Sequence, residues 1–198
     1  MTINPFDMLL HGLLLLTLLQ STHGFPGSRL LPTQCYPTLP LSRLPRPPPN
    51  TRPELVILGI GTQNYSCVDS APVSQGAVAS LFDITALQYA QHCVDAQRHP
   101  SVVQIGHHFF TSDRVPTFEI GKVERPFLFS GTKASSVPAP PTSLIPSVDW
   151  LYLTPNLTLP NEGSIQSVYR VKTRGGAPIS PCVGPQRVPY KAEYWFYT

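Results

Sequence analysis

Hydrophobic and polar residues alternate in short runs along the chain after residue 53, and turn-forming residues separate the runs. In the segment YKAEYWFY, residues 190–197, Lys191 and Glu193 fall on one face, opposite Tyr190 and Tyr194. Successive side chains of a strand point to opposite faces, so this period of two predicts a half-buried strand. The same pattern predicts nine strands, over residues 55–59, 63–68, 77–82, 105–110, 117–120, 126–129, 148–153, 167–173 and 190–197.

The fold class follows from these strands and from the segments between them. The strand at 167–173 places Val168, Arg170 and Lys172 on one predicted face and the residues between them on the other. One helix is predicted, capped by Asp83, with apolar residues at helical spacing and an end before Pro100. Residues 131–147 contain four prolines and are expected to form a long loop. Together they predict a mainly β fold, an antiparallel β-sandwich or barrel with one short helix.

The first 24 residues differ from the rest of the chain. Eight leucines between residues 9 and 19 form an apolar core, and the polar stretch QSTHG follows it. This layout is typical of a secretory signal peptide, with cleavage expected before Phe25. The core is too short to span the roughly 30 Å of hydrocarbon in a bilayer.

Three parts are therefore expected: a signal peptide over 1–24, a proline-rich N-terminal arm over 25–53 and a single β-rich domain over 54–198. The arm contains nine prolines between residues 26 and 53. Each proline fixes φ and removes a backbone donor, so the arm is expected to be extended and to be pinned to the body through Cys35.

The charge distribution argues against some classes of binding partner. The formal net charge is +3, and the basic residues are spread along the chain rather than gathered in a run. Nucleic acid is therefore not expected as a partner. The C-terminal KAEYWFYT lacks the apolar tail of a lipid-anchor signal, so no membrane anchor is expected after signal cleavage.

The cysteines indicate how the exported protein is stabilised. Cys35, Cys67, Cys93 and Cys182 all follow the signal peptide. An even number in an oxidising compartment predicts two disulfides, and three pairings are compatible with the sequence. The chain contains no Cys-x-x-Cys motif, which gives zinc or thioredoxin chemistry little support.

Export also makes two sequons candidate N-glycosylation sites, Asn64 in NYS and Asn156 in NLT. Asn156 follows a proline in a loop-like stretch and is the better acceptor. A fast-folding hairpin would hide Asn64.

The stretch ELVILGIGTQN, residues 54–64, begins as a dinucleotide-binding loop would, because a buried strand leads into Gly59-x-Gly61. Such a loop needs a third glycine followed by a helix. The third position is Asn64, and a predicted strand follows it. We therefore expect the two glycines to form a tight bend between paired strands, and we expect no cofactor.

The motifs LGIGTQNYSC, GAVASLFDIT, HHFF with PTFEI, VDWLYL, VYRVKTRGGAP and VPYKAEYWFY occur in this order. Together they resemble a family of secreted fungal proteins that is catalogued as a domain of unknown function and whose members often carry the label "malate dehydrogenase". The resemblance runs from about Glu54 to Tyr197. It implies extracellular, β-rich proteins with the same glycine bend, and it implies no catalytic residues. The dehydrogenase label finds no support in the glycine stretch described above.

Two histidines are the candidate metal ligands. His107 and His108 are adjacent in a predicted strand, so their side chains point to opposite faces. A metal site would need one of them together with Asp113 or Glu119. A structural, hydrogen-bonded histidine is the favoured interpretation, and no metal is predicted.

Sugar hydrolysis would need two carboxylates that face one cleft. The candidates are Asp83, Glu119, Glu124 and Asp149. Asp149 is the most suggestive because Trp150 follows it, and an aromatic face beside a carboxylate suits a sugar ring. A solvated Asp149 and a core Trp150 are favoured over this catalytic interpretation.

Trp150 and Trp195 are the candidate binding residues. Alternation should bury one subset of the aromatic residues in the predicted strands and expose the other. An exposed Trp195 would bind a cell-wall polysaccharide or an extracellular protein, but lining of the core is the favoured interpretation of these aromatic residues. We therefore expect a secreted, disulfide-containing glycoprotein, extracellular or associated with the cell wall, that binds rather than catalyses. A secreted hydrolase or metal-assisted enzyme acting on wall carbohydrate is the alternative.

Overall fold

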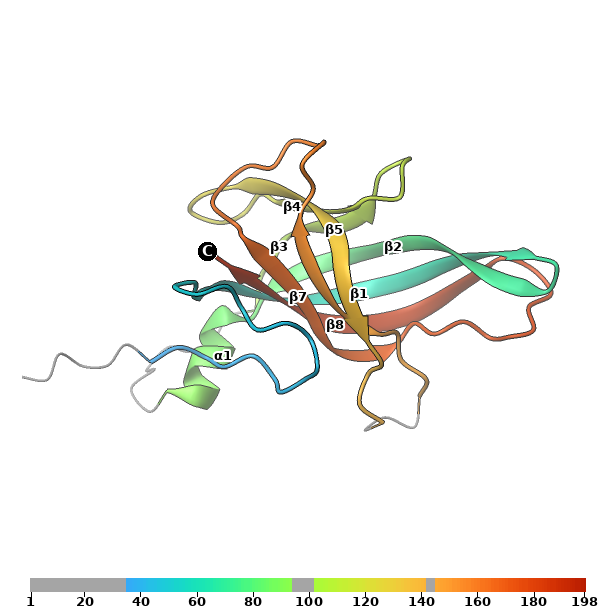
Figure 1. The fold of residues 1–198 in the computed structure, drawn as a ribbon, viewed down its shortest axis with the longest axis horizontal. Helices are drawn as coiled ribbons and strands as arrows, with labels where there is room; N and C mark the ends of the chain where they lie inside the picture. The colour runs from blue at the N-terminus through green and yellow to red at the C-terminus, as the bar shows by residue number, and fades with distance from the viewer. Residues whose placement is uncertain (1–34, 94–101, 142–144) are drawn as a thin grey trace, which may run out of the picture. The chain divides into compact units, whose positions relative to one another are not determined.

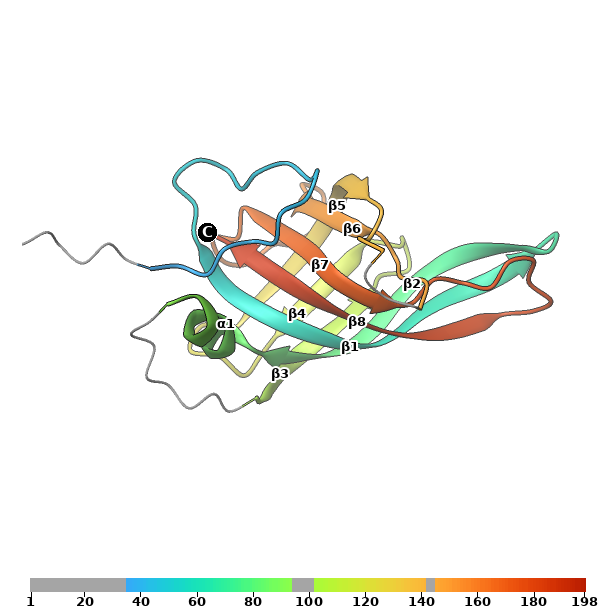
Figure 2. The ribbon, with the colours of Figure 1, turned by 90° about the horizontal axis from the view of Figure 1, so that it is seen from below.

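The computed structural model describes residues 35–93, 102–141 and 145–198. The predicted signal peptide, the first part of the arm and the predicted helix end beyond residue 93 lie outside these residues. Within them, eight antiparallel strands form a closed barrel in sequence order (Figure 1 and Figure 2). The strands are β1 (Pro53–Val68), β2 (Ala71–Asp83), β3 (Gln104–Phe110), β4 (Pro116–Ile120), β5 (Phe127–Val137), β6 (Trp150–Pro155), β7 (Ser167–Gly175) and β8 (Gln186–Tyr197).

The barrel confirms the predicted mainly β, antiparallel fold and excludes the sandwich form of it. Each strand pairs with its neighbours in sequence, and the pairing of β8 with β1 closes the sheet, so that none of the eight described strands has a free edge. Antiparallel order places the connections β1–β2, β3–β4, β5–β6 and β7–β8 at one end of the barrel. The helix α1 (Thr85–His92), which connects β2 to β3, lies near the C-terminus at the other end (Figure 2).

The helix begins close to the predicted capping residue. Asp83 Oδ1 accepts a hydrogen bond from the backbone N–H of Thr85 at 2.8 Å. The N-cap position itself is occupied by Ile84, with no side-chain capping bond, so the predicted cap at Asp83 is off by one residue. No helix in the described part of the chain is both long and apolar enough to cross a bilayer.

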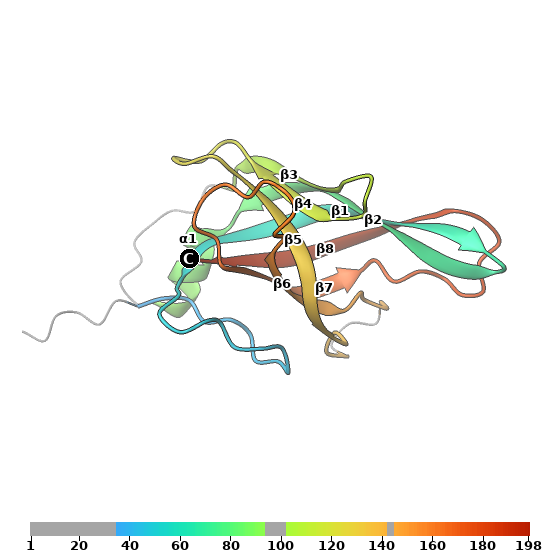
Figure 3. The same ribbon diagram turned by 45° about the horizontal axis from the view of Figure 1, so that its top comes forward.

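The glycines of the GxG stretch lie in the middle of β1, so the predicted bend is wrong. A Cβ atom on Gly59 would lie 2.7 Å from Cε2 of Tyr194, and one on Gly61 would overlap the carbonyl oxygen of Val78. Glycine is therefore required here because neighbouring groups approach the backbone closely, not because the chain turns. The two short strands predicted on either side of the glycines form one long strand, which extends with β2 and β8 beyond the rest of the barrel (Figure 3).

The loop predicted over residues 131–147 is wrong for its first part, because β5 continues to Val137 and pairs with β6. Most side chains from Thr132 to Val137 are exposed. Neither face of this part of the strand is apolar, so the alternation on which the strand predictions relied is absent here.

The face prediction for β7 is correct for Val168 and Arg170, which point inward, and wrong for Lys172. A bulge interrupts the pairing of β7 with β8 after Val171, and Lys172 adopts a left-handed φ of 48°. Its side chain consequently lies outside the barrel, where Nζ is 3.1 Å from Oε1 of Glu193. An extra residue in one strand shifts all later side chains to the opposite face.

The interior core fills the end of the barrel nearest α1. Phe118 lies within it, with its ring centroid 4.9 Å from that of Tyr194 and 5.4 Å from that of Phe196, both in edge-to-face contact. All eight strands contribute buried apolar side chains to this core, which comprises Leu55, Ile57, Ala77, Ala79, Leu81, Ile105, Phe118, Ile120, Phe129, Leu153, Val168, Tyr190, Ala192, Tyr194 and Phe196.

A second buried cluster lies on the outer face of the barrel, where the arm and the helix region cover it. Leu39 and Leu44 of the arm and Ile84 and Leu87 of the helix region pack with apolar residues of β1, β6, β7 and β8. The disulfide between Cys35 and Cys93 joins the arm to the residue that follows α1, which confirms that Cys35 pins the arm to the body.

Candidate functional site: a cavity in the barrel

A cavity of about 690 Å³ occupies the end of the barrel opposite α1. All eight strands contribute to its lining. Its volume lies within the range of typical small-molecule sites, roughly 300 to 1,000 Å³. An eight-stranded barrel has room for either a packed core or one small ligand, and this barrel has both, one at each end.

Small residues line part of the cavity wall, and large residues of the interior core close one end of it. Ser74 and Gly76 of β2 and Gly131 of β5 line its wall. Leu153 and Phe118, which belong to the interior core, also line it and close it toward the α1 end. The core and the cavity therefore share a boundary of buried side chains.

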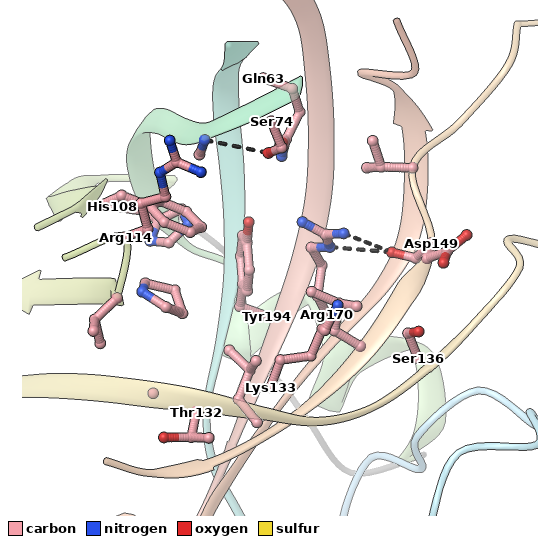
Figure 4. Close-up of a pocket in the computed structure, with 18 of the residues that line it drawn as sticks. Gln63, Ser74, His108, Arg114, Thr132, Lys133, Ser136, Asp149, Arg170 and Tyr194 are labelled. Atoms are coloured by element: carbon pink, nitrogen blue, oxygen red, sulfur yellow. Dashed lines mark hydrogen bonds between the residues drawn. The ribbon is translucent and has the colours of Figure 1, made fainter. Parts of the chain in front are cut away.

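Among the described residues that line this space, Arg170 is the one charged side chain that projects into it from a buried position. It comes from the inward face of β7 and is 8 % exposed. Its Nη2 and Nε donate hydrogen bonds to the backbone carbonyl oxygen of Asp149, at 2.8 Å and 3.2 Å (Figure 4). No carboxylate in the described part of the chain forms an ion pair with it.

Three phenols surround the guanidinium as neutral groups. The hydroxyls of Tyr190 and Tyr194 share a hydrogen bond of 3.0 Å, and Tyr65 donates to the carbonyl oxygen of Gly176 at 2.7 Å. Burial raises the pKa of all three, and raises that of Tyr190 well above the ordinary value of 10. Arg170 opposes this effect on each pKa, because a nearby cation favours the ionised phenol.

His108 forms part of the cavity wall as a neutral ring. It stacks on Phe118 with a centroid distance of 4.2 Å, and Nδ1 lies 2.8 Å from the carbonyl oxygen of Thr117. A carbonyl oxygen only accepts, so Nδ1 carries the proton and Nε2 is left as an acceptor. Burial lowers the pKa of His108 to about 4, against 6.5 for a free imidazole.

The predicted opposition of the two histidines is confirmed. His107 is exposed on the outer face and pairs across the sheet with Glu119, whereas His108 points inward. Asp113 is exposed in the turn between β3 and β4. In the described ranges no three His, Cys, Asp or Glu side chains gather in a way that could hold a metal ion.

The four candidate acids do not meet in one cleft. Asp149 lines the cavity, with its carboxylate exposed to solvent. Glu119 and Glu124 are exposed, and Asp83 lies next to α1. None of these three lines the cavity.

The two candidate binding tryptophans are buried in the outer cluster under the arm and the helix. Trp150 is 6 % exposed and Trp195 is fully buried. The indole Nε1 of Trp195 donates to Oε2 of Glu193 at 3.0 Å. Trp195 is therefore a packed side chain, the interpretation that the sequence favoured over an exposed binding residue, and the arm contributes to its cover.

Two disulfides are formed, as predicted, between Cys35 and Cys93 and between Cys67 and Cys182. The second bridge links the β1–β2 hairpin to the segment before β8.

Both sequons contain half-buried asparagines. Asn64 lies within β1, and Asn156 directly follows β6, where its Oδ1 accepts from Thr158 Oγ1 at 2.7 Å. Their glycosylation stays a prediction.

Sequence reasoning missed the two polar residues that distinguish the cavity, Arg170 and Gln63. Gln63 points inward from β1 and is 5 % exposed, and its Nε2 has no hydrogen-bond partner. The available clue was Arg170 itself, a charge on the same predicted face as Val168. Charged side chains are rarely buried without a partner, so an arginine on a predicted core face indicates a candidate functional residue.

Comparison with curated proteins and with solved structures finds no match to the chain. A family model does match residues 47–198, which include the whole barrel. The chain belongs to the family described as "Protein of unknown function (DUF3455)".

Proposed function

We propose that the protein is exported and acts outside the cell as a non-catalytic binding protein that holds a small organic ligand in the barrel cavity. The observation that carries this proposal is the cavity of about 690 Å³, which is bounded by buried core residues and open at one end. Preformed cavities with mostly apolar walls and a few polar groups are the usual form of small-molecule sites.

Export is supported by two independent features. The leucine-rich leader over residues 1–24 has the layout of a signal peptide. The two disulfides are typical of proteins that fold in an oxidising compartment. The likeness to secreted fungal proteins agrees with both, and a wall-associated, glycosylated product fits the same compartment.

Binding is favoured over hydrolysis by the composition of the cavity. Glycoside hydrolysis needs two carboxylates facing one cleft, and within the described lining Asp149 is the sole carboxylate. The "malate dehydrogenase" label is not favoured either. Gly59 and Gly61 lie within an antiparallel strand instead of leading into a helix that could hold a pyrophosphate.

The test is binding of N-phenyl-1-naphthylamine, a neutral dye that fluoresces in apolar sites. We expect saturable binding with one site per chain. Leu151→Trp should weaken it at least 10-fold, because Leu151 lines the cavity and packs on the interior core. The matched control is Tyr152→Trp, on the same strand but packed against the outer cluster. No saturable binding, or equal binding by Leu151→Trp, would contradict the proposal.

A further inference from the structure

We propose that the cavity takes a ligand with a carboxylate on an apolar, ring-bearing body, and that Arg170 binds the carboxylate. This inference rests on the proposed function and names the class of ligand for the same cavity. The observations that carry it are the burial of Arg170, the lack of a counter-ion and the orientation of the guanidinium.

The charge of Arg170 is not neutralised by the protein. The side chain is more than nine-tenths buried, and no described carboxylate lies within ion-pair distance of it. The inward-facing groups that interact with it are the phenols of Tyr65, Tyr190 and Tyr194 and the imidazole of His108, none of which is an anion at neutral pH. A buried charge is normally paired, so an anion from outside the chain would complete this site.

The guanidinium is oriented and still has free donors. It carries five N–H groups, of which one on Nε and one on Nη2 go to the carbonyl oxygen of Asp149. That contact holds one edge of the group in place without cancelling its charge. The remaining N–H groups, on Nη1 and Nη2, are left for the Tyr194 hydroxyl and for a ligand. A planar carboxylate matches the fork of an arginine.

The charges around the cavity favour an anion with a single negative charge. Arg114 and Lys133 are exposed and line the cavity with Arg170, whereas Asp149 is the one carboxylate in the described lining. This excess of cations attracts anions. Inside, a single buried cation balances one negative charge, so a phosphate dianion would keep an unpaired charge in a site of low dielectric.

The walls determine the rest of the ligand. His108, Phe110 and Phe118 form an aromatic side, with ring centroids of His108 and Phe110 5.4 Å apart. Such faces favour an apolar ring. The buried amide of Gln63 adds an unpartnered Nε2, and an acceptor on the ligand would offset the cost of leaving it unpaired.

The test compares 2-naphthoate with 2-naphthamide, which have the same shape and differ in charge, by calorimetry or dye displacement. A hydrogen-bonded charge typically strengthens binding about 10- to 100-fold, so wild type should prefer the naphthoate by that factor. Arg170→Gln should abolish the preference. The matched control is Arg174→Gln, which removes the same charge from the same strand outside the cavity and should keep the preference.

A second variant covers the case in which Arg170→Gln does not fold. Arg170→Lys keeps the charge but loses the planar fork, so the preference should fall several-fold. Equal affinities of wild type for the two probes would overturn the inference, and so would a full preference in either Arg170 variant. Tighter binding of 2-naphthyl phosphate than of 2-naphthoate would overturn the assignment to a carboxylate.

The two proposals fail in different ways. In the first case, the naphthamide and the neutral dye bind, Leu151→Trp blocks both, and the naphthoate binds no more tightly than the naphthamide. The cavity is then a binding site, and only the carboxylate inference fails. If neither probe nor dye binds, the proposed function itself fails.

Discussion

The backbone carbonyl oxygen of Asp149, and not its carboxylate, holds the guanidinium of Arg170, at 2.8 Å from Nη2 and 3.2 Å from Nε. Asp149→Asn should therefore leave Arg170 in place. We expect the free energy of unfolding to change by less than about 0.5 kcal/mol, the range of ordinary surface substitutions. Urea denaturation measures it. A loss of more than about 2 kcal/mol would show that the carboxylate takes part in holding the arginine.

Acid should destabilise the protein through His108. Its pKa is about 4 in the fold and about 6.5 when unfolded, so the unfolded chain takes up the proton first as the pH falls. The stabilisation from the neutral ring is complete above pH 6.5 and is lost progressively down to pH 4, by about 3 kcal/mol in total.

This acid sensitivity can be assigned with two variants. His108→Phe should flatten the dependence of the unfolding free energy on pH between 6.5 and 4. His107→Gln, the exposed neighbour, should leave it as in wild type. An unchanged slope in His108→Phe would mean that other groups carry the acid sensitivity.

Gly59→Ala should destabilise the barrel by about 1 to 3 kcal/mol, the usual effect of overpacking a core. The added Cβ would lie 2.7 Å from Cε2 of Tyr194, a ring that is fully buried and cannot move freely. Gly121→Ala is the control, because nothing lies within 4 Å of the position of its Cβ. Thermal unfolding of both variants checks the difference, and equal stabilities would contradict the tight approach.

The two disulfides should differ in their effect on the cavity. Removing either should lower the free energy of unfolding by about 4 to 5 kcal/mol, because they close loops of 58 and 115 residues. Only the pair Cys67→Ser and Cys182→Ser should also weaken dye binding. The segment that this bridge holds includes Ala177 and Pro178, which line the cavity. Intact binding in that double variant would show that the bridge does not support the cavity wall.

Trp195→Ala should act on stability rather than on a surface contact. The indole is fully buried between the sheet and the covering segments, so its loss should cost about 3 to 5 kcal/mol. Leu41→Ala, at an arm residue that is 98 % exposed, should change stability little. If Trp195→Ala is as stable as wild type but loses sedimentation with wall glucan or chitin, the ring acts as a surface ligand instead.

The alternation of apolar and polar residues predicted the strands correctly where one face of the strand is buried and the other is exposed to solvent. In β8, Lys191 and Glu193 fall opposite Tyr190 and Tyr194, as their spacing predicted. The prediction was wrong where that contrast disappears. The end of β5 borders the open cavity and has no apolar face, so its sequence predicted a loop. The bulge at Lys172 changes the face of the residues that follow it.

The candidate site could not be predicted, because its members come from strands distant in the sequence. Arg170 on β7 and Gln63 on β1 line one cavity, although more than a hundred residues separate them. The cover over Trp195 could not be predicted for a similar reason. The period of two along a strand shows which side chains share a face of the sheet. It does not show that the N-terminal arm packs over the face that carries Trp195.

The sequence by itself determined the mainly β class, the single helix near Asp83 and the presence of two disulfides. These depend on local periodicity, on a capping residue and on the number of cysteines. Only the tertiary structure decided that the sheet closes, which cysteines pair and that one end of the barrel stays hollow. Closure joins Pro53 to Tyr197 across almost the whole described chain, and contacts of that range depend on the shear and tilt of all the strands together.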